Sequence, residues 1–219
     1  MPATRSEIAA QAAQLIADGG LDYQSAKRRA ARDVLGDKRI GASQLPDNDE
    51  IDACLREHLA LFDATHDARI ARYRAVAALW MTRLHAYNPY VTGAAWKGIV
   101  APHAQLHLQL FTDDQKELEI RLIDDGIQFD VSEIAHFAGG GEVTALSFEW
   151  EDVPVLLSVY AWDDLRGALR RRSSGPNAGR ADRGTLAQLR EREVAVADGA
   201  GAPGADADAG AGAGARAGR

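Results

Sequence analysis

The chain has 219 residues, a hydrophobic fraction of 46% and a formal net charge of -7 at pH 7. This length and composition predict one globular domain with a tail. The acidic balance disfavours a protein that coats nucleic acid or anionic membrane through bulk charge. The single cysteine, Cys54, cannot form an internal disulfide, and no apolar run approaches the roughly 18 residues of a membrane span. We therefore expect a cytoplasmic protein that does not associate with membranes.

Residues 1–88 are expected to form a helical region. One helix is predicted from about Ser6 to Ala17, and a second over DYQSAKRRAARDVLG, which ends at Gly36. The second helix carries four cations, Lys27, Arg28, Arg29 and Arg32. These cations fit either a solvated helix face or a patch that faces phosphate.

The stretch from Ile51 to Tyr87 has apolar residues at steps of three and four, which is typical of helix. One long helix fits this pattern, and so do two helices broken near residues 63–67. Asn88-Pro89 ends the helical region, because the residue before proline disfavours helical geometry.

The stretch VTGAAWKGIVAPHAQLHLQLF, residues 91–111, predicts a turn at Gly93 followed by a strand. Side chains of a strand alternate between two faces. One face carries Leu106, Leu108 and Leu110 and is expected to be buried. The opposite face carries Gln105, His107 and Gln109.

The remaining elements predict an α+β fold, with an α/β core at residues 89–172. We expect a helix at 115–125, strands at 127–131, 142–149 and 153–161, and a short helix at 163–169. Residues 173–219 are glycine-rich and of low complexity, so we expect a largely disordered tail. Within this tail only 185–194 could form a helix.

Two resemblances follow from these motifs. The segments LDYQSAKRRAAR, LPDNDEI, VTGAAWKG, HLQLF and YAWDDLRGAL resemble recurring features of a group of small proteobacterial proteins, over about residues 6–170. The order of glycine turn and polar strand is similar to the polymerase-β-type nucleotidyltransferase superfamily. The resemblance implies a helical N-terminal region packed on a small mixed sheet of nucleotidyltransferase type. In that superfamily the turn holds nucleotide phosphates, and an Asp-x-Asp or Asp-x-Glu pair on the strand holds two Mg²⁺ ions.

Mapped onto this chain, the resemblance places Gly93 and Ala94 at the turn. It places Gln105 and His107 at the paired carboxylates, as the catalytic residues. An amide and an imidazole cannot replace two carboxylates around Mg²⁺, so we predict a degenerate site with no metal ligands. His107 is then a hydrogen-bonded cleft residue or, alternatively, a base or ligand.

The predicted ligand-binding residues are Gly93, Ala94, Trp96, Lys97 and Gln109. Lys97 is the candidate for a direct phosphate contact, and Trp96 either stacks on a base or covers the core. The expected ligand is a nucleotide or another phosphorylated small molecule, and nucleic acid is not an expected partner.

Two alternative functions remain at this stage. The first is an active nucleotidyltransferase whose atypical Mg²⁺ site recruits Glu149 or Glu151. The second is a protein-interaction module that docks a partner on the Ile51–Tyr87 region. A UDP-N-acetylmuramate–alanine ligase, a label that similar sequences could carry, lacks support because the chain has no Gly-Lys-Thr/Ser phosphate loop.

Overall fold

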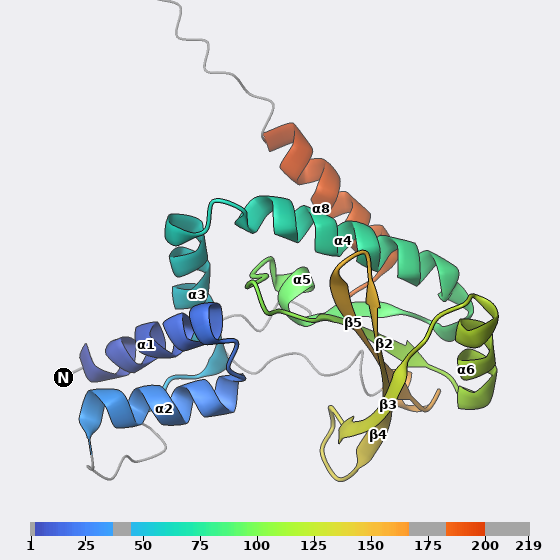
Figure 1. The fold of residues 1–219 in the computed structure, drawn as a ribbon, viewed down its shortest axis with the longest axis horizontal. Helices are drawn as coiled ribbons and strands as arrows, with labels where there is room; N and C mark the ends of the chain where they lie inside the picture. The colour runs from blue at the N-terminus through green and yellow to red at the C-terminus, as the bar shows by residue number, and fades with distance from the viewer. Residues whose placement is uncertain (1–2, 37–44, 167–182, 200–219) are drawn as a thin grey trace, which may run out of the picture.

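The computed structural model describes residues 3–36, 45–166 and 183–199 (Figure 1). The described chain is α+β, with a helical N-terminal group on one side and a mixed sheet on the other. The α+β class and the mixed sheet predicted from the sequence are confirmed. No helix among the described residues is both long and apolar enough to cross a membrane.

Three helices build the N-terminal group: α1 (Ala3–Gly19), α2 (Tyr23–Leu35) and α3 (Asn48–Phe62). Asp22 caps α2 by accepting the backbone N–H groups of Gln24 and Ser25. Asp47 and Glu50 form a reciprocal capping box at the start of α3, which satisfies two N–H groups that the first helical turn leaves unpaired. The three helices bury their own apolar cluster, whose larger members are Ile8, Ile16, Ile51, Leu55 and Leu59.

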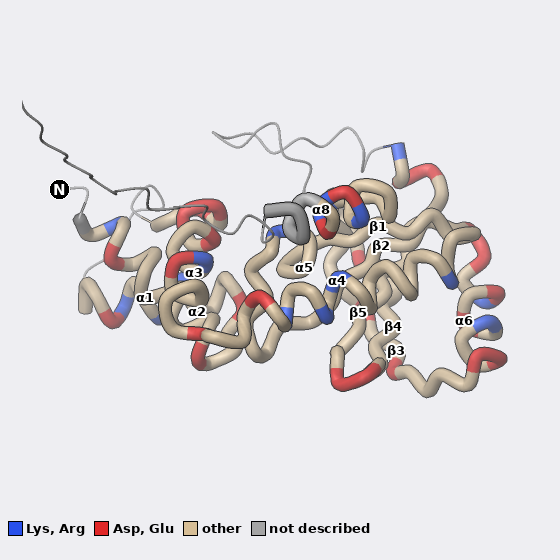
Figure 2. Tube along the Cα trace, turned by 90° about the horizontal axis from the view of Figure 1, so that it is seen from above, with Lys and Arg blue, Asp and Glu red and all other residues tan. Residues whose placement is uncertain are grey.

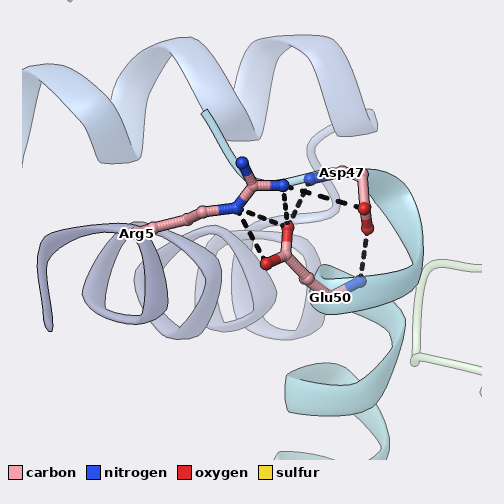
Figure 3. Close-up of polar contacts among 3 residues, drawn as sticks. All are labelled: Arg5, Asp47 and Glu50. Atoms are coloured by element: carbon pink, nitrogen blue, oxygen red, sulfur yellow. Dashed lines mark hydrogen bonds and ion pairs between the residues drawn. The ribbon is translucent and has the colours of Figure 1, made fainter. Parts of the chain in front are cut away.

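An arginine joins the first and third helices (Figure 3). The Arg5 guanidinium of α1 donates two hydrogen bonds to Glu50 Oε2, from Nε at 2.9 Å and from Nη2 at 2.6 Å. It also lies 3.7 Å from the Asp47 carboxylate. Because Glu50 accepts the N–H of Asp47 at the same time, one carboxylate both caps α3 and holds α1 against it.

The predicted Ile51–Tyr87 stretch consists of two helices. α3 ends at Phe62, and α4 (His66–Arg83) follows after a short turn, with a 3-10 turn η2 (His85–Tyr87) behind it. Asp63 holds the turn by accepting hydrogen bonds from Thr65 and Arg69. Of the two alternatives that the sequence left open, the structure has the two helices with a break near residues 63–67.

One mixed sheet contains six strands within the described residues, in the order β3-β4-β5-β2-β1-β6. The strands are β1 (Tyr90–Thr92), β2 (Leu106–Phe111), β3 (Asp130–Ala135), β4 (Glu142–Trp150), β5 (Val153–Tyr160) and β6 (Arg183–Gly184). β2 and β5 run parallel, and the other neighbouring pairs run antiparallel. The chain elements α5 (Gly93–Lys97) and α6 (Gln115–Asp124) follow β1 and β2 respectively.

The alternation predicted for the central strand is confirmed. Leu106, Leu108 and Leu110 are fully buried in the main core, against α4, α6 and the neighbouring strands. His107 and Gln109 lie on the opposite face and are only partly buried. The hairpin of β4 and β5 also turns at Glu151 and Asp152 as predicted, both with positive φ.

Two predicted boundaries need correction. The strand expected at 127–131 is β3 at Asp130–Ala135, because Ile127 and Phe129 pack against the core before the pairing with β4 begins. Residues 183–199, assigned to the tail, instead form β6 and α8 (Leu186–Gly199), and Leu189 of α8 is fully buried in the main core. The helix that 185–194 could form is thus present. Residues 173–182 and 200–219 lie outside the described residues, as do 167–169 of the predicted short helix.

Candidate functional site

A cavity of about 470 Å³ lies where the helical group meets α5 and β2. Figure 1 shows α5 between that group and the sheet. Five of the predicted site residues line the cavity: Gly93, Ala94, Lys97, Gln105 and His107. Its apolar wall comes from both sides, with Ile16, Leu21 and Leu55 from the helical group and Ile99 and Ala101 from the loop after α5. The structure therefore brings the turn and the polar strand face into one concave site.

Gly93 makes the close approach between the turn and the strand. Its φ is +62°, in the left-handed region that side chains other than glycine rarely adopt. A Cβ atom at this position would lie 3.9 Å from Cγ and Nδ1 of His107. The imidazole thus sits directly against the open backbone of Gly93.

The His107 imidazole is partly buried, which favours its uncharged form. Burial lowers the pKa of the His107 imidazole below its usual value, and no carboxylate opposes this effect. The hydrogen-bonded cleft role predicted for this residue is not seen, since the described residues give His107 no hydrogen-bond partner. The His107 side chain, which lines the cavity, is therefore a candidate hydrogen-bond partner for a ligand.

Lys97 belongs to an ion pair that crosses from the core to the helical group. Its Nζ donates to Asp52 Oδ2 of α3 at 2.5 Å, and the hydroxyl of Tyr23 in α2 donates to Asp52 Oδ1. Asp52 is only 5% exposed, so its carboxylate relies on these two donors. Burial, and then the nearby Asp52 charge, raises the pKa of Tyr23 far above its usual value, which keeps this hydroxyl protonated as a donor.

The loop that closes the cavity, residues 98–105, is held by helix α4. Arg69 donates from Nε to the carbonyl of Val100 at 2.9 Å, and the Tyr73 hydroxyl donates to the carbonyl of Ala104 at 2.7 Å. On the other side, a Cβ at Gly20 would lie 3.1 Å from Cβ of His103. The loop is therefore fixed between α4 and the turn that follows α1.

Two predicted ligand-binding residues lie elsewhere. Trp96 is 5% exposed, and the Arg192 guanidinium of α8 lies 3.5 Å from its ring centroid. Trp96 therefore covers the core, which is the second of the two roles predicted for it. Gln109 accepts a 2.6 Å hydrogen bond from Arg183 of β6. Neither residue lines the cavity.

Among the described residues, the strand neighbours of His107 supply no carboxylates for a two-metal site. Its neighbours on the next two strands are Leu156 of β5 and Ser147 of β4. Glu149 lies two strands from β2, about 10 Å away, and the Glu151 carbonyl accepts from Arg72 of α4. Within the described ranges no three His, Cys, Asp or Glu side chains converge as metal ligands do.

The cations of α2 do not line the cavity. Arg29 pairs with Asp33 along the helix, and Arg28 donates to Ser25. Figure 2 shows Lys and Arg interspersed with Asp and Glu along the chain. This arrangement supports the solvated helix face over the phosphate-facing patch.

Among the residues of the site, Gly20, Asp22, Tyr23, Asp52 and His103 were not predicted from the sequence. Tyr23 falls in the LDYQSAKRRAAR segment, and Asp52 directly follows the LPDNDEI segment. Comparison of the chain with protein-family models and with curated proteins finds no match. The chemistry of the cavity therefore has to be argued from its own residues.

The cavity combines an apolar wall with a few polar groups at one end, an arrangement typical of small-molecule sites. Lys97 can offer a phosphate or carboxylate the N–H groups that Asp52 does not use. His107 and Gln105 can exchange hydrogen bonds with a neutral ligand group. These groups can bind and orient a ligand, whereas Mg²⁺-dependent transfer would need carboxylates that they do not supply.

Proposed function

We propose that this chain is a nucleotidyltransferase-like protein that binds a nucleotide or another phosphorylated small molecule in this cavity and does not transfer it. The observation that carries the proposal is the convergence of Gly93, Lys97 and His107 on one cavity. The volume, about 470 Å³, lies within the range of about 300–1,000 Å³ typical of small-ligand sites.

The nucleotidyltransferase assignment is supported by the order of elements. β1 leads through Gly93 into α5, β2 returns antiparallel to β1, and β5 pairs with β2 in parallel. The polar face of β2 looks onto the turn, as the resemblance implies. In the part of the chain that the structure describes, no carboxylate lies at or beside His107 on the sheet, which supports binding without transfer.

The two alternatives are less well supported. An active enzyme needs Glu149 or Glu151 near His107, and neither lines the cavity. An interaction module needs an exposed apolar stripe along Ile51–Tyr87, but most of that stripe is buried, including Leu55, Trp80 and Leu84. Phe62, at the end of α3, is an exception, being 75% exposed.

Isothermal titration calorimetry of the full chain with ATP, GTP, CTP, UTP and their monophosphates tests the proposal. We expect at least one nucleotide to bind equally well with and without Mg²⁺, and no pyrophosphate to be released from any triphosphate. Binding that strictly requires Mg²⁺, together with pyrophosphate release, would establish the enzyme instead. No binding of any nucleotide or of inorganic phosphate would contradict the proposal.

A matched pair of lysine variants locates the binding. Lys97→Met should weaken binding about tenfold or more, the size of one lost charge-assisted contact. Lys116→Met, at an exposed position of α6, should leave affinity unchanged. Because Lys97→Met leaves the buried Asp52 without its ion-pair partner, the double variant Lys97→Met/Asp52→Asn removes both charges and provides the comparison if the single variant unfolds.

A further inference from the structure

The charges around the cavity set a limit on the charge of its ligand. Lys97 is the cation among the described lining residues, and it already shares its charge with Asp52. Asp22 also lines the cavity, and its hydrogen bonds to the side chain and backbone of Ser25 lower its pKa, so it is ionised at neutral pH. Burial lowers the pKa of His107, which disfavours a second positive charge in the cavity.

The geometry points to a ligand with a single phosphate: we infer that Asp52 is a specificity-determining residue that makes this cavity select monophosphates over di- and triphosphates. This inference rests on the proposed function, because it concerns the phosphorylated ligand of the same site. One phosphate can take the N–H groups of Lys97 that Asp52 leaves unused. Asp52 does not line the cavity, but it lies directly behind Lys97, so each further phosphate adds like charge near Asp52 and near Asp22 of the lining, with no second described cation to offset it.

The position of Asp52 makes this effect strong. Its carboxylate is buried, and both of its oxygens are engaged, by Lys97 and by the Tyr23 hydroxyl. Tyr23 comes from α2 and Lys97 from α5, so the carboxylate is held from two sides and cannot swing away from an incoming anion. A buried charge is also screened less by solvent and salt than a surface charge.

The expected effect is a falling affinity along each nucleotide series. In a partly aqueous site, a nearby like charge weakens binding about fivefold for each added charge. We therefore expect the mono-, di- and triphosphate of a nucleoside to bind progressively more weakly without Mg²⁺. Such an order is the reverse of what a triphosphate-using site needs.

Calorimetry on the full chain with AMP, ADP and ATP, and with the same series for the other three nucleosides, tests the inference in Mg²⁺-free buffer. Asp52→Asn should reduce the ratio of triphosphate to monophosphate dissociation constants about fivefold or more. Asp33→Asn is the matched control, since it removes a carboxylate of α2 that pairs with Arg29 and does not line the cavity, so the ratio should stay as in the wild type. Asp22→Asn keeps a good helix cap and should reduce the ratio in the same direction, which preserves the test if Asp52→Asn does not fold.

The outcomes separate this inference from the proposed function. A triphosphate that binds the wild type as tightly as its monophosphate, or tighter, would overturn the inference and leave nucleotide binding standing. An unchanged ratio in both Asp52→Asn and Asp22→Asn would also overturn it. No binding by any nucleotide would remove the proposed function and the inference together.

Discussion

Replacing Asp52 by alanine should destabilise the chain, because the carboxylate joins three separate elements. The substitution removes the Lys97 ion pair and the Tyr23 hydrogen bond. Breaking a buried pair by removing one partner costs about 3–5 kcal/mol. The Lys97 side chain is 30% exposed and can regain water, so we discount that figure to a loss of about 2–4 kcal/mol.

Urea unfolding followed by far-UV circular dichroism measures this loss. The midpoint should fall while the dependence on urea concentration stays constant, because the surface exposed on unfolding hardly changes. Asp33→Ala is the matched control: it removes a carboxylate from the exposed pair with Arg29, and should change stability by less than about 0.5 kcal/mol. Equal effects of the two substitutions would show that Asp52 does not hold the helical group to the core in solution.

Three further predictions concern the core, the C-terminal elements and pH. Gly184→Ala should lower the free energy of unfolding in urea by about 2 kcal/mol or more, because a Cβ at this position would lie 2.1 Å from the Trp96 ring. An unchanged urea midpoint would refute this contact. Leu189→Ala should lower the free energy of unfolding by about 2–4 kcal/mol, whereas Val194→Ala, at an exposed position of the same helix, should leave it almost unchanged. Equal losses of stability in the two variants would argue that α8 does not pack in the core. Because the pKa of His107 is lowered from 6.5, its contribution to stability is present above pH 6.5 and lost as pH falls through the folded pKa. In unfolding curves between pH 7 and 5, His107→Gln should therefore lose stability less steeply than the wild type, and equal slopes would contradict the shift.

Much of the sheet could be predicted from local patterns. The alternation of Leu106, Leu108 and Leu110 identified both the strand and its buried face, because a period of two leaves little choice when one face is apolar. The turns at Gly93 and at Glu151-Asp152 were predicted from their composition and position. These features depend on neighbours within a few residues, which a single sequence displays directly.

The partners in the cavity could not be predicted, because they depend on how distant elements meet. Asp52 and Lys97 are 45 residues apart, and nothing local to either indicates the other. The sequence alone left Lys97 as a free phosphate contact, whereas the structure gives it a buried counter-charge. Likewise Trp96 is covered by Arg192, a residue 96 positions later, in a segment whose composition predicted a tail.

The most direct test of the binding site uses the histidines as reporters. The chain has six, of which His103 and His107 line the cavity, while His85 and His136 do not. In an NMR titration of the full chain with AMP, GMP, CMP and UMP, at least one should shift the imidazole resonances of His103 and His107 with a common dissociation constant. Those of His85 and His136 should stay unchanged. Shifts confined to His85 or His136, or no shift with any of the four nucleotides, would contradict a phosphorylated ligand in this cavity.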